Sequence, residues 1–213
     1  MKTDELIGFL STGLQPVPPT HAGARVARWA GLGLLGALVL MFAFYGLRRD
    51  LAAATAWPMF WFKIGLPLGM ALAGGWAVAR LGRPGLSARG AVAVVAVLLA
   101  LVWSMGLVQW LDAPRAERPV LLWGQTWQAC LWSVGWIGLP MFVAALFALR
   151  QLAPTRPRWA GAAAGLLAGG TGAAVYALHC PELTAPFLAV WYVLGMALPV
   201  VVGAWLGPRL LRW

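Results

Sequence analysis

Charged residues are scarce in this sequence. They make up 10% of the 213 residues, and only six residues are acidic, whereas soluble domains carry about 25% charged residues. Hydrophobic residues account for 62% of the chain instead. A water-soluble fold of this length could not bury so much apolar surface. The composition therefore excludes a soluble globular domain and indicates a membrane protein.

Residue types that carry chemistry are also few, with two cysteines and two histidines. The sequence has no CxxC or HExxH pattern, so we expect no cofactor and no dedicated metal site. It also lacks a Ser/His/Asp set, a glycine-rich phosphate loop and a pair of haem-binding histidines. No acidic residue lies deep in an apolar stretch, which disfavours a proton or cation pathway. We therefore expect no enzymatic activity.

Long apolar runs fill most of the chain, and each can cross the roughly 30 Å of a bilayer core as a helix. We expect an all-α polytopic membrane protein in which residues 27–213 form one transmembrane domain. Its six spans are predicted at residues 27–47, 57–79, 91–111, 127–149, 159–178 and 187–206. The connections are short, so neighbouring helices are expected to pack as three hairpins. No removable signal peptide is expected.

Basic residues give the chain a net charge of +10, but they are scattered in short loops between apolar runs. This pattern indicates membrane topology and not direct binding of nucleic acid. With the N-terminus inside, eleven of the 16 basic residues fall on the cytoplasmic side: Lys2, Arg25, Arg28, Arg80, Arg83, Arg89, Arg150, Arg156, Arg158, Arg209 and Arg212. The opposite loops carry Arg48, Arg49, Arg115 and Arg118, balanced by Asp50, Asp112, Glu117 and Glu182. We therefore predict a multi-pass protein of the bacterial inner membrane with both termini in the cytoplasm.

The two cysteines, Cys130 and Cys180, are both predicted on the periplasmic side, in the fourth span and at the end of the fifth. That compartment is oxidising, so a disulfide is possible if their Cα atoms lie within about 7 Å. The alternative is two buried thiols that act as small hydrophobic side chains. His179 and Glu182 flank Cys180 in one short loop, where soft metals or oxidants could react with the thiol.

Lys63 is the only charged residue that lies more than one residue from the end of a predicted span. Charges within a membrane are functional candidates by default. Lys63, however, lies about six residues from the outer end of its span, close enough for its ammonium to reach the interface. We expect this snorkelling arrangement.

Residues 1–26 are the only sizeable segment outside the spans, and they begin with a short amphipathic helix. Its first turn carries Asp4 and Glu5, and its apolar face is formed by Leu6, Ile7, Leu10 and Leu14. Pro16, Pro18 and Pro19 then end the helix and form a stiff spacer. An acidic helix is poorly suited to anionic headgroups, so we expect it to dock in a protein groove and not on lipid.

Distinctive motifs lie near the C-terminus, in residues 178–182, at Phe187, at Trp191-Tyr192, and in residues 194–199 and 207–213. They resemble the NrsF family of negative regulators of an extracytoplasmic-function (ECF) sigma factor. Phe60-Trp61-Phe62-Lys63 and the stretch Thr3-Asp4-Glu5-Leu6-Ile7 extend the resemblance over nearly the whole chain.

The resemblance implies a six-helix membrane anti-sigma factor that holds its cognate ECF sigma factor at the cytoplasmic face. It also implies release of that partner on oxidative or heavy-metal stress, sensed by periplasm-side cysteines, and Cys130 and Cys180 match those positions. Binding of the sigma factor is expected at the N-terminal helix, through Asp4, Glu5, Leu6, Ile7, Leu10 and Leu14.

Two other classes of function share some of these features. A membrane thiol-disulfide oxidoreductase also uses periplasmic cysteines in a small bundle, but it needs two redox pairs and a quinone. A small transporter or channel is suggested by the prolines within the second, fourth and sixth spans, because broken helices often line transport sites. The scarcity of buried polar residues disfavours the transporter.

Overall fold

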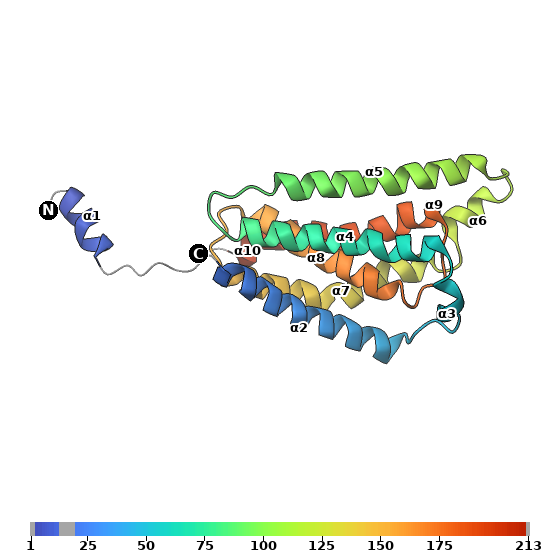
Figure 1. Ribbon diagram of the computed structural model, residues 1–213, viewed down its shortest axis with the longest axis horizontal. Helices are drawn as coiled ribbons and strands as arrows, with labels where there is room; N and C mark the ends of the chain where they lie inside the picture. The colour runs from blue at the N-terminus through green and yellow to red at the C-terminus, as the bar shows by residue number, and fades with distance from the viewer. Residues whose placement is uncertain (1–2, 13–19, 212–213) are drawn as a thin grey trace.

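The structure, a computed structural model, describes residues 3–12 and 20–211, and every regular element among them is helical (Figure 1). The six longest helical stretches follow the six predicted spans. They are α2 (Thr20–Phe44), α4 (Pro58–Leu81), α5 (Arg89–Asp112), α7 (Trp127–Arg150), α8 (Pro157–Tyr176) and the sequence α9 (Ala185–Phe187), η1 (Leu188–Tyr192) and α10 (Val193–Leu210). Shorter helices are α1 (Thr3–Ser11), α3 (Leu51–Ala54) and α6 (Arg118–Trp123). The helix α2 begins before residue 26, where the sequence placed the domain boundary.

Among the described residues, five helical stretches are long and apolar enough to cross a membrane: Gly23–Phe44, Pro58–Leu81, Arg89–Asp112, Arg118–Arg150 and Ala185–Leu210. The helix α8, in the range of the predicted fifth span, is not among them. Its residues are mostly glycine and alanine, and most of them are buried against other helices. This helix is therefore shielded by protein along most of its length, and its sequence needs less apolar character than a lipid-facing helix.

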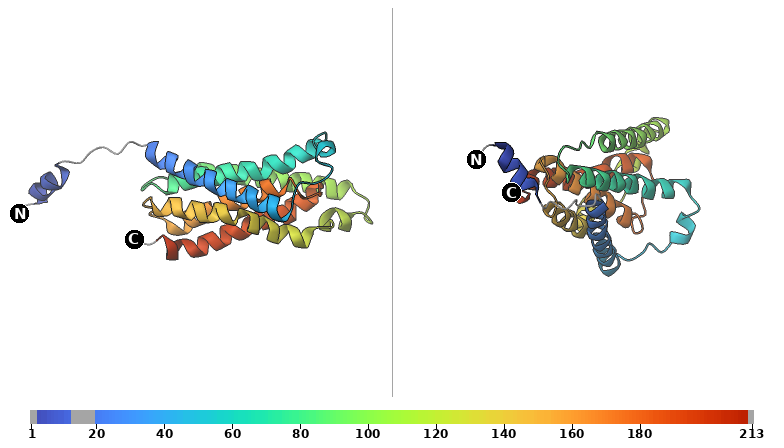
Figure 2. Two further views of the ribbon diagram at one scale, coloured as in Figure 1. Left: turned by 90° about the horizontal axis from the view of Figure 1, so that it is seen from below. Right: turned by 60° about the vertical axis from the view of Figure 1, so that its left-hand side comes forward.

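Helix α8 lies at the centre of the bundle and packs against α10, α4 and α7 (Figure 2). Its glycines make these close approaches possible. Gly161, Gly165 and Gly169 face the backbone of α10, Gly170 faces α4, and Gly172 faces α7. A Cβ atom at any of these positions would overlap the neighbouring backbone. Small residues at helix interfaces are the usual way in which membrane helices approach each other closely.

Three of the long helices contain a proline within their length, at Pro67, Pro140 and Pro199, and the helix continues past each of them. The last helical stretch has a further irregularity that hydropathy does not reveal, because Leu188–Tyr192 form a π-helix. Trp103 of α5 donates a hydrogen bond from Nε1 to the carbonyl oxygen of Ala189 within this segment, at 3.0 Å. Single-turn π segments are frequent at functional sites.

The links between helices gather at two ends of the bundle (Figure 1). We call one end the cysteine end; it carries residues 45–57, 113–126 and 177–184, with α3 and α6 among them. The other, the basic end, carries the start of α2, residues 82–88 and 151–156, and the end of α10. None of the acidic residues of α2–α10 lies at or near the basic end. The described arginines there are Arg25, Arg28, Arg80, Arg83, Arg89, Arg150, Arg156, Arg158 and Arg209.

Candidate functional site

Both cysteines lie at the cysteine end. Cys130 is in the first turn of α7, and Cys180 follows the last turn of α8. Each side chain is a free thiol with 0% exposure, and both belong to the same hydrophobic cluster. The two thiols are also close enough to interact electrostatically. The fold thus brings together two cysteines that are far apart in the sequence and removes both from solvent.

Lys63 of α4 is buried beside these thiols, and the expected snorkelling arrangement is wrong. Its side chain has 0% exposure. The ammonium group donates hydrogen bonds to the carbonyl oxygens of Cys180, at 2.6 Å, and Glu182, at 2.7 Å. It also lies 5.3 Å from the ring centroid of Tyr192. Because these partners satisfy the ammonium inside the bundle, it does not need to reach the interface.

The position of Lys63 gives the site its electrostatic character. Its ammonium interacts with both Cys130 and Cys180. No carboxylate neutralises it by direct contact, since the only ion pair within the described residues joins Arg48 and Asp50. A cation beside thiols stabilises the thiolate, the form that attacks oxidants and binds soft metals. Burial of both thiols acts in the opposite direction, because removal from water favours the neutral thiol over the thiolate.

Glu182 is held by the segment that precedes α7. Its Oε1 atom accepts hydrogen bonds from the backbone N–H of Gln125, at 2.7 Å, and from the hydroxyl of Thr126, at 3.4 Å. The same hydroxyl lies 3.9 Å from the sulfur of Cys180. Gly124 has a positive φ of 55°, and a Cβ there would lie 2.8 Å from the Glu182 carboxylate. The turn before α7 therefore requires glycine to receive this side chain.

His179 packs against the link after α2 and against two tyrosine rings. Its Nδ1 atom lies 3.1 Å from the carbonyl oxygen of Gly46, and its ring packs between Tyr45 and Tyr176, at centroid distances of 5.3 Å and 5.8 Å. Within the described residues, no group of three or more histidine, cysteine, aspartate or glutamate side chains could hold a metal ion. His179 and Glu182 both anchor the loop after α8, and the Thr126 hydroxyl that contacts Glu182 also lies against the Cys180 sulfur.

Arg48 fixes the same loop from the link after α2. Its backbone N–H donates to the carbonyl oxygen of Leu178 at 3.2 Å, and its guanidinium reaches the carbonyl oxygen of Cys180 at 3.4 Å. The guanidinium also pairs with Asp50 at 2.7 Å. The side-chain hydrogen bonds between Arg48 and Asp50 lower the pKa of the Asp50 carboxyl to about 2 and raise the pKa of the Arg48 guanidinium. The carbonyl of Cys180 thus accepts from two cations on two different elements.

Tyr192, in the π-helix η1, completes the wall of the site. It is fully buried, and its hydroxyl has no partner with hydrogen-bond geometry among the described residues. The Cys180 thiol is among its electrostatic neighbours. Because a buried hydroxyl without a partner is costly, the Cys180 thiol is the group that this hydroxyl is placed to contact.

The sequence revealed only part of this site. It singled out the cysteines, and it singled out Lys63 as the one charge away from the ends of the spans, but it assigned Lys63 to the interface. The sequence did not place Arg48, Thr126 or Tyr192 at this site, because they reach it through tertiary packing from three separate segments.

The helix α1 has the predicted amphipathic character. Asp4 and Glu5 lie in its first turn, and none of its residues is buried. Leu6, Ile7 and Leu10 are 40%, 59% and 62% exposed, and Phe9, which the sequence analysis missed, is 75% exposed. Phe9 extends the same apolar stripe, since it lies three residues after Leu6. Leu14 and the three prolines lie outside the described residues.

Comparison with known proteins covers the whole chain. A family model described as NrsF, negative regulator of sigma F, matches residues 10–213. The chain is 43% identical over 213 residues to the probable anti-sigma-F factor NrsF of Azospira oryzae, and the match covers all of both chains. It is 42% identical over 218 aligned residues to the anti-sigma-F factor NrsF of Caulobacter vibrioides, again over the full length of both. No solved structure matches significantly.

Proposed function

This chain belongs to the NrsF family of negative regulators of sigma F, and from that membership we propose that it is a membrane anti-sigma factor. It sequesters a cognate ECF sigma factor at the cytoplasmic face of the inner membrane and releases it on oxidative or heavy-metal stress. The observation that carries this proposal is the full-length match to relatives named as anti-sigma-F factors. The geometry of the two ends of the bundle supports it.

The proposed placement is six membrane spans with both termini inside. Five helical stretches are apolar enough to cross, and α8, enclosed by α4, α7 and α10, crosses with them as the sixth. The concentration of arginine at the basic end supports a cytoplasmic location for that end, because positively charged loops stay inside. The cysteine end then faces the periplasm.

Helix α1 is the proposed docking element for the sigma factor. Its apolar stripe buries nothing in this chain, and an unpartnered amphipathic helix is suited to a groove on another protein. Asp4 and Glu5 add negative charge that favours a basic groove. The bound sigma factor would thus be held beside the basic end of the bundle.

Thiol chemistry at the cysteine end is the proposed trigger. An oxidant accepts two electrons while Cys130 and Cys180 lose two protons and form a disulfide, or both thiolates bind a soft metal ion. Either event pulls the start of α7 toward the loop after α8. Lys63 connects that loop to α4, whose far end lies at the basic end. The change would then pass along α4 and α7 to the sigma-binding side, which is a two-state mechanism.

Co-purification of ECF sigma factors with the full-length protein tests the sigma-binding role. We expect the wild-type chain to retain one sigma factor, and Phe9→Glu or Leu10→Glu to reduce retention at least tenfold, because a charge would be buried at the interface. Gly8→Glu adds the same charge on the other side of the helix, where a side chain meets nothing within 4 Å, and serves as the control. Failure of the wild-type chain to retain any sigma factor would refute the proposal.

A further inference from the structure

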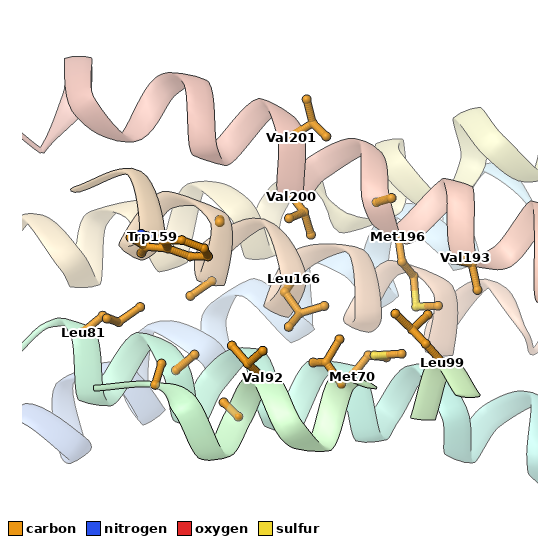
Figure 3. A pocket seen from close by; sticks show the side chains of 17 residues that line it. Met70, Leu81, Val92, Leu99, Trp159, Leu166, Val193, Met196, Val200 and Val201 are labelled. Carbon is orange, nitrogen blue, oxygen red and sulfur yellow. The ribbon is translucent and has the colours of Figure 1, made fainter. Parts of the chain in front are cut away.

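A second feature of the bundle lies far from the thiols, between α4, α5, α8 and α10. It is a cavity of about 350 Å³ whose lining residues are all apolar (Figure 3). Met70 and Leu81 of α4 form one side, and Val92 and Leu99 of α5 form another. Leu166 of α8, together with residues of α10 such as Met196 and Val200, closes the space.

The cavity exists because α5 packs mainly on α4, α9 and η1 and not along α8 and α10. Only Ala91, Val102 and Gly106 of α5 are buried. The lining extends along α5 from Ala88 to Leu99, a rise of roughly 16 Å at 1.5 Å per residue. This is about half of the roughly 30 Å hydrocarbon core. The cavity therefore has the depth of one bilayer leaflet, beginning at the basic end.

A second pocket, which contains two arginines, shares Trp159 with the cavity at that end. It is lined by Arg156, Pro157, Arg158, Trp159 and Pro208, and Trp159 also lines the apolar cavity. Other arginines at the basic end, such as Arg80 and Arg150, donate to main-chain carbonyls. Arg156 and Arg158 have no such partner within the described part of the chain. Two free guanidinium groups thus stand at the mouth of an apolar, leaflet-deep cavity.

We propose that these adjoining pockets bind one anionic phospholipid, with an acyl chain in the cavity and the phosphate on Arg156 and Arg158. The guanidinium fork matches a phosphate group, and basic pockets between membrane helices are typical headgroup sites. The absence of acidic residues of α2–α10 from this end favours an anionic lipid over a zwitterionic one. Trp159 is suited to the boundary between chain and headgroup. The site rests on the proposed membrane placement and not on binding of a sigma factor.

Native mass spectrometry of the full-length protein, released from nanodiscs with equal phosphatidylglycerol and phosphatidylcholine, tests this site. We expect one retained phosphatidylglycerol, favoured roughly thirtyfold over phosphatidylcholine by the two arginines.

The double variant Arg156→Gln/Arg158→Gln should lose the preference for phosphatidylglycerol. The control Arg49→Gln/Arg115→Gln removes the same charge at the cysteine end and should keep the preference. Val92→Trp fills the cavity and should release both lipids. The control Val39→Trp on α2, at a position of matching exposure (57% against 58% for Val92), should release neither lipid.

Equal retention of the two lipids would overturn the site, as would a preference that survives the arginine double variant. A dimer that disappears in Val92→Trp would show that a second copy of the chain fills the cavity, which would also overturn it. Failure of the protein to enter nanodiscs at all would overturn the membrane placement together with this site. Incorporation without lipid preference would overturn the lipid site alone.

Discussion

Lys63 is the residue on which the cysteine end depends most. Its ammonium ties α4 to the loop after α8 through two carbonyl oxygens, and it does so beside both thiols. A buried cation without a carboxylate partner is unfavourable unless hydrogen bonds satisfy it. The local structure therefore places a strongly polar group where it influences the chemistry of Cys130 and Cys180.

Replacing Lys63 with Met should loosen this loop. The carbonyl oxygen of Glu182 would lose its ammonium donor, at a cost of about 1–3 kcal/mol for an unsatisfied group. The carbonyl oxygen of Cys180 would lose the closer of its two donors and keep Arg48. We expect a lower unfolding midpoint in detergent and faster labelling of Cys180 by maleimide. Trp61→Phe removes an exposed hydrogen bond to the Thr55 carbonyl at the same end and should change neither quantity. Unaltered labelling of Cys180 in Lys63→Met would show that Lys63 does not hold the loop.

The sequence could identify Lys63 as exceptional but not its environment. The distance of Lys63 from the end of its span is compatible with both snorkelling and burial. What decides between them is the position of the loop after α8, which supplies the two carbonyl oxygens from more than a hundred residues away. Tertiary contacts of this kind leave no local pattern in the chain.

At the scale of elements, α8 organises the bundle. Its close packing depends on glycines whose neighbours are backbone atoms of other helices, as at Gly165, where a Cβ would lie 2.6 Å from the Cα of Val200. Hydropathy located this helix approximately but did not show its central position. The π-helix η1 was likewise not predicted, because the sequence from 187 to 206 has the apolar length of an ordinary helix.

Gly165→Ala should destabilise the bundle by about 1–3 kcal/mol, because the backbone of α10 would have to move to admit a methyl group. Gly65→Ala on α4 is the matched substitution, since a Cβ there meets nothing within 4 Å. It should be neutral or stabilising, because alanine is the better helix former. Unfolding by sodium dodecyl sulfate in mixed micelles measures both. Equal stability of the two variants would contradict the central packing of α8.

At the scale of the whole molecule, the bundle has two chemically distinct ends. The cysteine end holds both thiols, and its four arginines are balanced by four acidic residues, whereas the basic end holds only positive charge among the described residues of α2–α10. The separation of charge followed directly from the sequence, because short loops between apolar runs are easy to assign to sides. The burial of the thiols together with Lys63 required the three-dimensional fold.

Reporter fusions test the orientation of these ends. We expect alkaline phosphatase to be active when fused after Ala116, at the cysteine end, and inactive when fused after Gln151, at the basic end. A green fluorescent protein fused at the same two positions should give the opposite pattern. It becomes fluorescent when it folds in the cytoplasm but not when it is exported in an unfolded state. The reverse result at both positions would place the thiols in the cytoplasm and contradict the proposed topology.

The central claim is that thiols at one end of the bundle control a sigma factor at the other. The most direct test is expression of the sigma-dependent genes after dichromate or cadmium in cells that carry Cys130→Ser/Cys180→Ser. Ala173→Ser, which adds a hydroxyl at another fully buried position of the same cluster, controls for the change in packing. We predict strong induction with the wild type and the control, and none with the double serine variant. Equal induction in all three would contradict the claim.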